Sequence, residues 1–113
     1  MDCIFCKLIN GVIPTEVVYE DERVFAFKDT DPQAPIHYLF VPKEHISSAN
    51  ELNEQNAAVV ASIYLAIARV AKRDGFDQAG YRVVANCGED GGQSVHHMHF
   101  HVMAGRKMLW PAG

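Results

Sequence analysis

The sequence predicts an α+β fold, namely a five-stranded antiparallel meander sheet with one long helix and a short N-terminal helix. Three observations predict it. Short apolar runs bounded by turn residues lie on both sides of a single long segment with helical spacing. The chain has 113 residues, of which 49% are hydrophobic, and this suits one packed domain rather than two. It contains no repeat and no linker, so residues 1–113 are predicted to form a single domain.

The first third of the chain alternates short elements with turns. The expected elements are a short helix at 4–9, a hairpin of strands at 17–20 and 24–28, a loop with two prolines at 29–35 and a third strand at 38–41. Asn10-Gly11 and Pro14 should end the helix, and Pro42 should end the third strand.

A long helix is expected to start near Asn53. Its apolar residues recur at the spacing of one helical face and are all interpreted as core: Val60, Ile63, Tyr64, Ile67, Val70 and Ala71. Basic residues occupy its last turns and Gly75 stands at the expected C-cap. A fourth strand at 81–85 and a glycine-rich loop at 88–92 should follow.

The predicted fifth strand, residues 97–103, carries the most informative pattern. Residues two apart in a strand share a face, so His97, His99 and His101 should line one face while the apolar residues between them enter the core. Neighbouring imidazoles in such a row start about 6–7 Å apart, which suits several contacts around one phosphate.

This histidine row has three interpretations. It can be a solvated sheet face, a set of nucleophile and acid–base groups, or part of a catalytic zinc site. Strict alternation opposite an apolar face, directly after a glycine-rich loop, favours the two chemical interpretations.

Composition argues against several classes of protein. The formal net charge is -4 and no basic block is present, which disfavours binding to nucleic acid or a membrane surface. No apolar run is long enough for a membrane span, and the N-terminal residues lack the pattern of a secretory signal. Three cysteines, an odd number, argue against a disulfide framework, so a cytoplasmic location is expected.

Residues 97–103 read His-Met-His-Phe-His-Val-Met, which matches the signature His-φ-His-φ-His-φ-φ (φ, apolar) of the histidine triad (HIT) family. The resemblance covers nearly the whole chain and points to the Hint branch. Segments that carry it include Ile4-Phe5, Ile13-Pro14, Tyr19-Glu20-Asp21, the run from Val41 to Ile46 and the ending Trp110-Pro111-Ala112-Gly113. The HIT-like fold that this implies agrees with the fold predicted above.

The resemblance implies an enzyme that binds purine nucleotides and cleaves the P–N bond of nucleoside 5'-phosphoramidates, such as AMP-lysine-like compounds, or aminoacyl-adenylates. On this pattern His99 attacks phosphorus and forms a nucleotidyl-histidine intermediate. His101 contacts the phosphate and helps to protonate the leaving group, and His97 orients the central ring. His96 is expected to point away and to have no catalytic role. No cofactor is required for this catalysis.

The resemblance also implies a nucleotide pocket. Asn86, Gly92, Gln93 and Ser94 would surround the phosphate, with backbone N–H groups of the glycine-rich loop turned inward. Asp29 would bind the ribose hydroxyls. The remaining residues would lie on the side of the base: Ile4, Phe5, Phe27, Thr30 and His37.

Cys3 and Cys6 form a Cys-x-x-Cys pair that many Hint proteins lack. In distant relatives such a pair joins two histidines around a structural zinc, and the matching positions are His45 and His97. Two small buried cysteines without a metal are the other interpretation.

The resemblance further implies a homodimer, in which the long helix and a strand meet their symmetry copies and the tail with Trp110 approaches the partner's site. Two other functions stay open. One is hydrolysis of dinucleoside polyphosphates, as in the Fhit branch, and the other is a nucleotide-binding interaction module with incidental catalysis.

Overall fold

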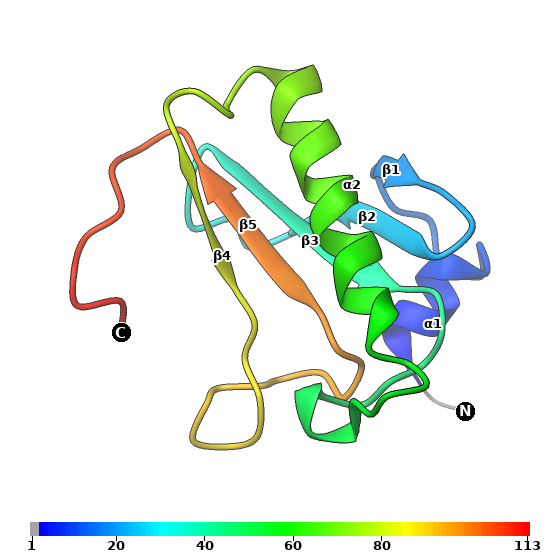
Figure 1. Ribbon diagram of the computed structural model, residues 1–113. Coiled ribbons are helices and arrows are strands. Elements are labelled where there is room, and N and C mark those ends of the chain that lie inside the picture. The colour runs from blue at the N-terminus through cyan, green and yellow to red at the C-terminus, as the bar shows by residue number, and fades with distance from the viewer. Residues whose placement is uncertain (1–2) are drawn as a thin grey trace.

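The structure is a computed structural model that describes residues 3–113. The elements follow in the order α1 (Ile4–Ile9), β1 (Val17–Glu20), β2 (Val24–Lys28), β3 (Ile36–Pro42), a short 3-10 helix η1 (Ala49–Glu51), α2 (Ala58–Asp74), β4 (Tyr81–Val84) and β5 (Phe100–Ala104). Figure 1 shows the long helix α2 lying across one face of the sheet. The predicted α+β class, with five antiparallel strands, one long helix and a short N-terminal helix, is confirmed.

The strand order is β1-β2-β3-β5-β4. The first three strands form the predicted meander, but β5 returns between β3 and β4, so the last two strands do not follow sequence order. Burial explains this exchange. Alternate residues of β5 are fully buried, whereas no residue of β4 is, so the more apolar strand takes the inner position and β4 forms the edge.

Strand alternation divides the core into two layers. On one face, residues such as Ala26, Phe40 and Val102 pack against the buried stripe of α2. On the other face, Phe27 and Leu39 belong to a smaller cluster with Phe5 of α1. The sheet is therefore covered on both faces, and its second face is the one that α1 covers.

The helix α2 begins five residues later than predicted. The Asn53 side chain accepts hydrogen bonds from the backbone N–H groups of Gln55 and Asn56, and this local turn replaces the first helical turn. Gly75 ends the helix with a φ of 80°, as expected. Tyr64 is not a core residue as predicted, because it is 48% exposed and only the side of its ring packs on Phe100. No helix within residues 3–113 is long and apolar enough to cross a membrane.

The fifth strand is shorter than predicted, since β5 begins at Phe100 and not at residue 97. Its ladder with β3 ends at the pair Phe40 and Phe100. Pro42 has no N–H to continue the ladder, and the N–H of Met98 donates instead to the carbonyl of Ile46 at 2.6 Å. His97 and His99 therefore precede the strand, with a bend at residues 95–97.

Candidate active site

A cavity of about 340 Å³ opens on the face that α1 covers, and His99 and His101 lie in its wall. Six residues predicted to bind nucleotide also line it: Ile4, Phe5, Phe27, Asp29, Thr30 and Ser94. Seven residues that were not predicted to bind nucleotide complete the lining: Leu8, Ile13, Pro14, Thr15, Lys28, Leu39 and Val95. Strand pairing could have indicated Leu39, because it stands opposite Phe27 in the sheet.

The glycine-rich loop is held by its own side chains. The Gln93 amide donates to the carbonyls of Ser47 and Val95 at 2.7 and 3.0 Å, and its oxygen accepts from the N–H of Gly88. Asn86 donates to the carbonyl of Gly91 at 2.7 Å. Neither Asn86 nor Gln93 lines the cavity, so the structure gives both a part in shaping the loop.

Two backbone N–H groups of this loop donate to carbonyls within the loop. The N–H of Gly92 donates to the carbonyl of Glu89, and the N–H of Gln93 donates to the carbonyl of Gly88. Gly92, at a φ of 78°, supplies the turn and does not line the cavity. Ser94 is the predicted phosphate contact that the loop presents to the cavity.

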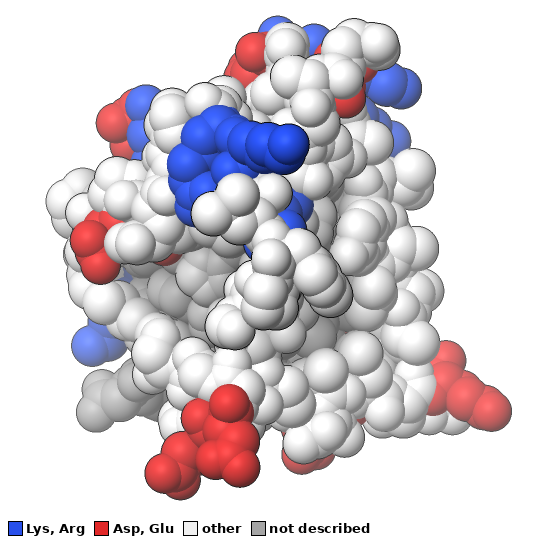
Figure 2. Space-filling view, turned by 90° about the vertical axis from the view of Figure 1, so that its left-hand side faces the viewer, with Lys and Arg blue, Asp and Glu red and all other residues white. Residues whose placement is uncertain are grey.

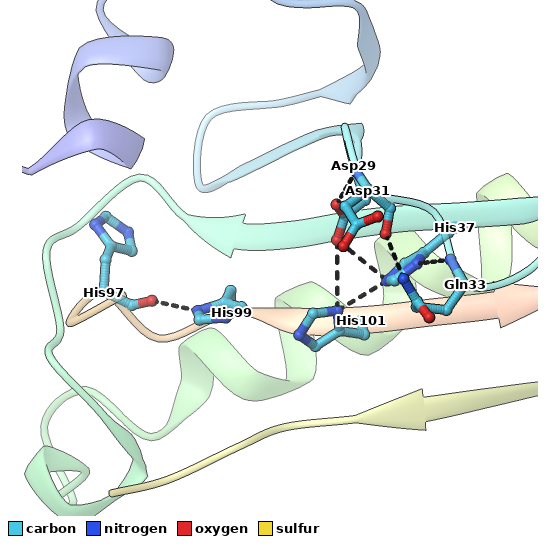
Figure 3. A network of polar contacts seen from close by, with 7 residues as sticks. All are labelled: Asp29, Asp31, Gln33, His37, His97, His99 and His101. Atoms are coloured by element: carbon cyan, nitrogen blue, oxygen red, sulfur yellow. Dashed lines mark hydrogen bonds and ion pairs between the residues drawn. The ribbon is translucent and has the colours of Figure 1, made fainter. Parts of the chain in front are cut away.

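The central histidine has a defined tautomer. His99 Nδ1 lies 2.7 Å from the backbone carbonyl of His97, so this nitrogen carries the proton and donates it (Figure 3). His99 Nε2 therefore carries a lone pair and no proton. Within residues 3–113 every fully buried side-chain nitrogen has a hydrogen-bond partner. His99 Nε2 has no such partner, so it is not fully buried and must be open to the cavity that His99 lines. A nucleophilic nitrogen needs this arrangement.

His37, predicted to lie on the side of the base, is not among the residues that line the cavity. It is buried on β3 behind His101, and Figure 3 shows the two rings meeting across the strands. The backbone N–H of Gln33 donates to His37 Nδ1 at 3.0 Å. The proton of His37 is then on Nε2, which lies 2.9 Å from His101 Nδ1 and donates to it. The remaining proton of neutral His101 is on Nε2, which lies on the opposite side of the ring.

Electrostatics favour the neutral form of both rings. Burial lowers the pKa of His101 to about 4, and the charges of His99 and His37 act in the same direction. Burial also lowers the pKa of His37, and the carboxylate of Asp29 opposes this effect only in part. That carboxylate lies 3.3 Å from His37 Nε2 and 3.8 Å from His101 Nδ1. It can accept the Nε2–H of His37, and its charge stabilises a positive charge on either ring.

The third histidine turns toward the two N-terminal cysteines. His97 Nε2 donates to the carbonyl of Pro42 at 2.8 Å, which leaves Nδ1 as a lone pair. His97 Nδ1 lies 3.3 and 3.6 Å from the sulfurs of Cys3 and Cys6 and 3.2 Å from His45 Nδ1. His97 is fully buried and does not line the cavity.

The four predicted metal ligands are brought together, because the ligand atoms of Cys3, Cys6, His45 and His97 all lie within 4.8 Å of one another. Tetrahedral zinc with ordinary bond lengths would hold a sulfur and a nitrogen about 3.5 Å apart and two nitrogens about 3.3 Å apart. The observed sulfur–nitrogen distances of 3.3 to 3.6 Å and the nitrogen–nitrogen distance of 3.2 Å fit this geometry.

A second cluster of Asp29, His37 and His101 also has ligand atoms within 4.8 Å of one another. Its hydrogen bonds favour a different use. A metal on His37 Nε2 would move the ring proton to Nδ1, where it would face the donating N–H of Gln33. The hydrogen bond from Gln33 therefore disfavours a metal ion on His37 Nε2.

Phe5 connects α1 to the row of histidines. Its ring meets His99 edge to face at a centroid distance of 5.1 Å and His97 at 5.9 Å, and it packs on Phe27 at 5.4 Å. The ring centroids of His99 and His101 are 5.2 Å apart. Figure 3 shows the three histidines following one another along the chain. The site thus presents an unprotonated imidazole nitrogen beside an N–H donor, next to an apolar wall.

The chain was compared with known proteins. The family described as "Scavenger mRNA decapping enzyme C-term binding" matches residues 2–110. A HIT-like protein of Synechococcus elongatus is 41% identical over 112 residues, which cover 99% of this chain and 97% of that protein.

Solved structures are similar over the same length. The crystal structure of a HIT family hydrolase from Legionella pneumophila is 43% identical with a TM-score of 0.96, covering 99% of this chain and 100% of that one. A histidine triad protein from Clostridium difficile is 51% identical with a TM-score of 0.94, covering 96% of this chain and 95% of that one. The geometry of the histidine row and these likenesses agree, and the chain belongs to the histidine triad family.

Proposed function

We propose that the protein is a nucleotide-binding hydrolase that cleaves the P–N bond of purine nucleoside 5'-phosphoramidates. The observation that carries this proposal is the hydrogen bond from His99 Nδ1 to the carbonyl of His97, because it leaves Nε2 as a free lone pair toward the cavity. The similarity to a HIT family hydrolase supports hydrolysis as the class of reaction.

The proposed reaction has two steps. His99 Nε2 attacks the α-phosphorus, and the new N–P bond forms as the bond from phosphorus to the amine breaks. The amine leaves with the electron pair and takes up a proton. Water then attacks phosphorus, the bond to Nε2 breaks, and the nucleoside monophosphate leaves as the imidazole is restored.

His101 is the proposed proton donor to the leaving amine. In the free protein its low pKa keeps it neutral, with its Nε2–H as a hydrogen-bond donor. A bound phosphate anion raises the pKa of a neighbouring imidazole, because it stabilises the charged form. The second proton would sit on Nδ1, and His37 would then release this nitrogen and donate its Nε2–H to the carboxylate of Asp29, 3.3 Å away. Substrate binding would thus prepare the acid that the reaction needs.

The rest of the cavity suits a nucleoside. Its wall is mainly apolar, with Ile4, Phe5 and Phe27 available to a flat purine ring. Asp29 lines the same cavity and is proposed to accept hydrogen bonds from the ribose. One of its oxygens already accepts from the N–H of Asp31 at 2.8 Å, so the other oxygen is the candidate for ribose and His101.

We also propose that the cluster of Cys3, Cys6, His45 and His97 holds a structural zinc ion. The distances and the free lone pair on His97 Nδ1 support it. When bound, zinc would join the N-terminal residues to the chain segment that carries the nucleophile. Thiolate ligands persist in a reducing compartment, so the cytoplasm remains the proposed location.

A homodimer that pairs along the edge strand β4 is proposed as the assembly. Tyr64 and Leu65 are exposed on α2, as expected for a helix that meets a second copy. Figure 2 shows a basic group in the upper middle of the face beside β4 and an acidic group at its lower edge, with other charges of both signs around the rim. Antiparallel pairing of two β4 strands would bring the basic group of each chain toward the acidic group of its partner. Light scattering should give the mass of a dimer, and Leu65→Arg should give a monomer.

Incubation with adenosine 5'-phosphoramidate tests the proposed activity. The wild type should release AMP, His99→Ala should release none, and a quenched wild-type reaction should contain an adenylyl group on His99. The turnover number at saturating substrate should survive EDTA. Normal turnover by His99→Ala would overturn the assignment. Faster turnover of a diadenosine polyphosphate would redirect it to the other family activity, and tight AMP binding without turnover of either substrate would indicate an interaction module.

A further inference from the structure

The short helix α1 contributes to two sites at once. Cys3 and Cys6 are one turn apart, and both sulfurs turn to the His45 and His97 cluster. Phe5, between them in sequence, faces the cavity together with Ile4 and Leu8 of the same helix. Any movement of α1 must therefore change the cysteine–histidine cluster and the cavity together.

The helix depends on its side-chain contacts for its position. It has six residues, and a helix of this length is not stable in water by itself. Phe5 is its one fully buried helical residue, and Cys3 is buried at its N-cap. The segment that follows α1 supplies three more lining residues, namely Ile13, Pro14 and Thr15. Residues 4–15 thus form one wall of the cavity, whereas His99, His101 and Ser94 belong to another.

We propose that Cys3 and Cys6 form an oxidation-sensitive clamp that sets nucleotide affinity through α1. In the reduced protein the two thiolates and two imidazoles hold a metal ion and fix the cavity wall. A peroxide oxidises the pair to a disulfide, which releases the ion and loosens the wall. This inference rests on the proposed function, because it concerns the affinity of the same nucleotide cavity.

The oxidation balances as a two-electron reaction. Two thiolates give one S–S bond and two electrons, and hydrogen peroxide with two protons takes these electrons to form two waters. Cys6 is the more exposed of the two residues, so peroxide would first oxidise it to a sulfenic acid. The sulfur of buried Cys3 then attacks the sulfur of Cys6, the S–S bond forms, and the hydroxyl group of the sulfenic acid leaves as water. A disulfide sulfur carries no ligand charge, so two imidazoles alone would remain for the metal.

The arrangement of the sulfurs favours this pairing over others. Both lie within 3.6 Å of the same nitrogen, His97 Nδ1, and the backbone N–H of Cys6 points to the sulfur of Cys3 at 3.4 Å. Cys87 lies outside the cluster, in the loop after β4. It provides a matched control, since its loss should leave the clamp intact.

The test uses the full-length, zinc-loaded protein before and after treatment with hydrogen peroxide. Released zinc is read with a chelating dye, free thiols by titration and AMP affinity by calorimetry. We expect release of one zinc per chain, loss of the thiols of Cys3 and Cys6, and an AMP Kd raised at least tenfold, which corresponds to about 1.4 kcal/mol. A dithiol reductant with added zinc should restore the original Kd. Amide hydrogen exchange should increase in α1 and stay unchanged in β5.

Two variants keep the test decisive. Cys87→Ser should behave as the wild type in every measurement. Cys6→Ser should bind AMP weakly before any treatment, and peroxide should not change its Kd. Unfolding curves for both variants separate this effect from general misfolding.

Three results would overturn the clamp. They are an unchanged AMP Kd after zinc release, a reduced protein that binds no zinc, and a disulfide that includes Cys87. The proposed hydrolysis is judged separately. A reduced protein that binds AMP in an oxidation-sensitive way but never cleaves a P–N bond would refute the activity and leave the clamp standing. A reduced protein that binds no AMP would refute both.

Discussion

Acidification should destabilise the ligand-free protein through His101. Burial lowers the pKa of this imidazole to about 4 in the folded state, with the charges of His99 and His37 adding to the effect. A histidine in an unfolded chain titrates at about 6.5. Between these two values the unfolded state binds more protons than the folded state. The free energy of unfolding therefore rises with pH across this window and is lost as the pH falls from about 6.5 to 4.

The size of the effect follows from the two pKa values. A shift from about 6.5 to about 4 corresponds to about 3.4 kcal/mol when the window is crossed completely. The His101 side chain is 22% exposed, so solvent screening reduces the effect below this limit. Between about pH 7 and about pH 5 we expect His101 to account for a loss of about 1.5 kcal/mol.

Urea unfolding at these two pH values measures the effect. The comparison is between the wild type and His101→Gln in the same metal state, because the difference then cancels contributions from the cysteine–histidine cluster. His96→Gln is the matched control, since His96 is an exposed histidine on the lead-in to the same strand. In His96→Gln the free energy of unfolding should change between the two pH values as much as in the wild type. In His101→Gln this change should be smaller by about 1.5 kcal/mol. If His101→Gln retains the full dependence, the burial argument for this site is wrong.

Three further substitutions test other parts of the structure. Phe5→Ala should lower stability by about 3 kcal/mol in urea unfolding and raise KM for the phosphoramidate, because the ring is buried against the cavity wall. Gly91→Ala should lower the melting temperature and kcat together, because a Cβ there would collide with the backbone carbonyl of Cys87 and displace the loop. Tyr38→Phe should cost about 1 kcal/mol and leave kcat unchanged, since it removes only the hydrogen bond to Asp74, 2.9 Å long and remote from the cavity.

The sequence pattern predicted which side each residue of the histidine segment faces, although the strand is shorter than expected. Facing depends on local backbone extension, which alternation in the sequence reports directly. The length of the ladder depends on the partner strand, and Pro42 interrupts that partner without leaving a mark in residues 97–103. Local patterns are therefore informative about faces and much less so about where pairing stops.

Contacts between distant residues decide which of the predicted site residues line the cavity. His37 stands 64 residues from His101 in the chain, and only the register of β3 against β5 brings their rings together. The resemblance placed His37 beside the base because it marks a functional position and not a geometry. Gln93 was taken as a ligand contact for the same reason, whereas its amide groups are used in holding the loop. Side chains that support a site and side chains that touch its ligand have similar sequence signals.

The role first given to His97 divides into two. Its backbone carbonyl fixes the tautomer of His99, and its imidazole belongs to the cysteine cluster. Main-chain groups also set the other rings, since the carbonyl of Pro42 orients His97 and the N–H of Gln33 orients His37. A main-chain donor or acceptor stays in place whatever side chain its residue carries, so the proton positions in this site depend on the backbone path. The imidazole of His97 is then free to bind a metal without altering which nitrogen of His99 carries the proton.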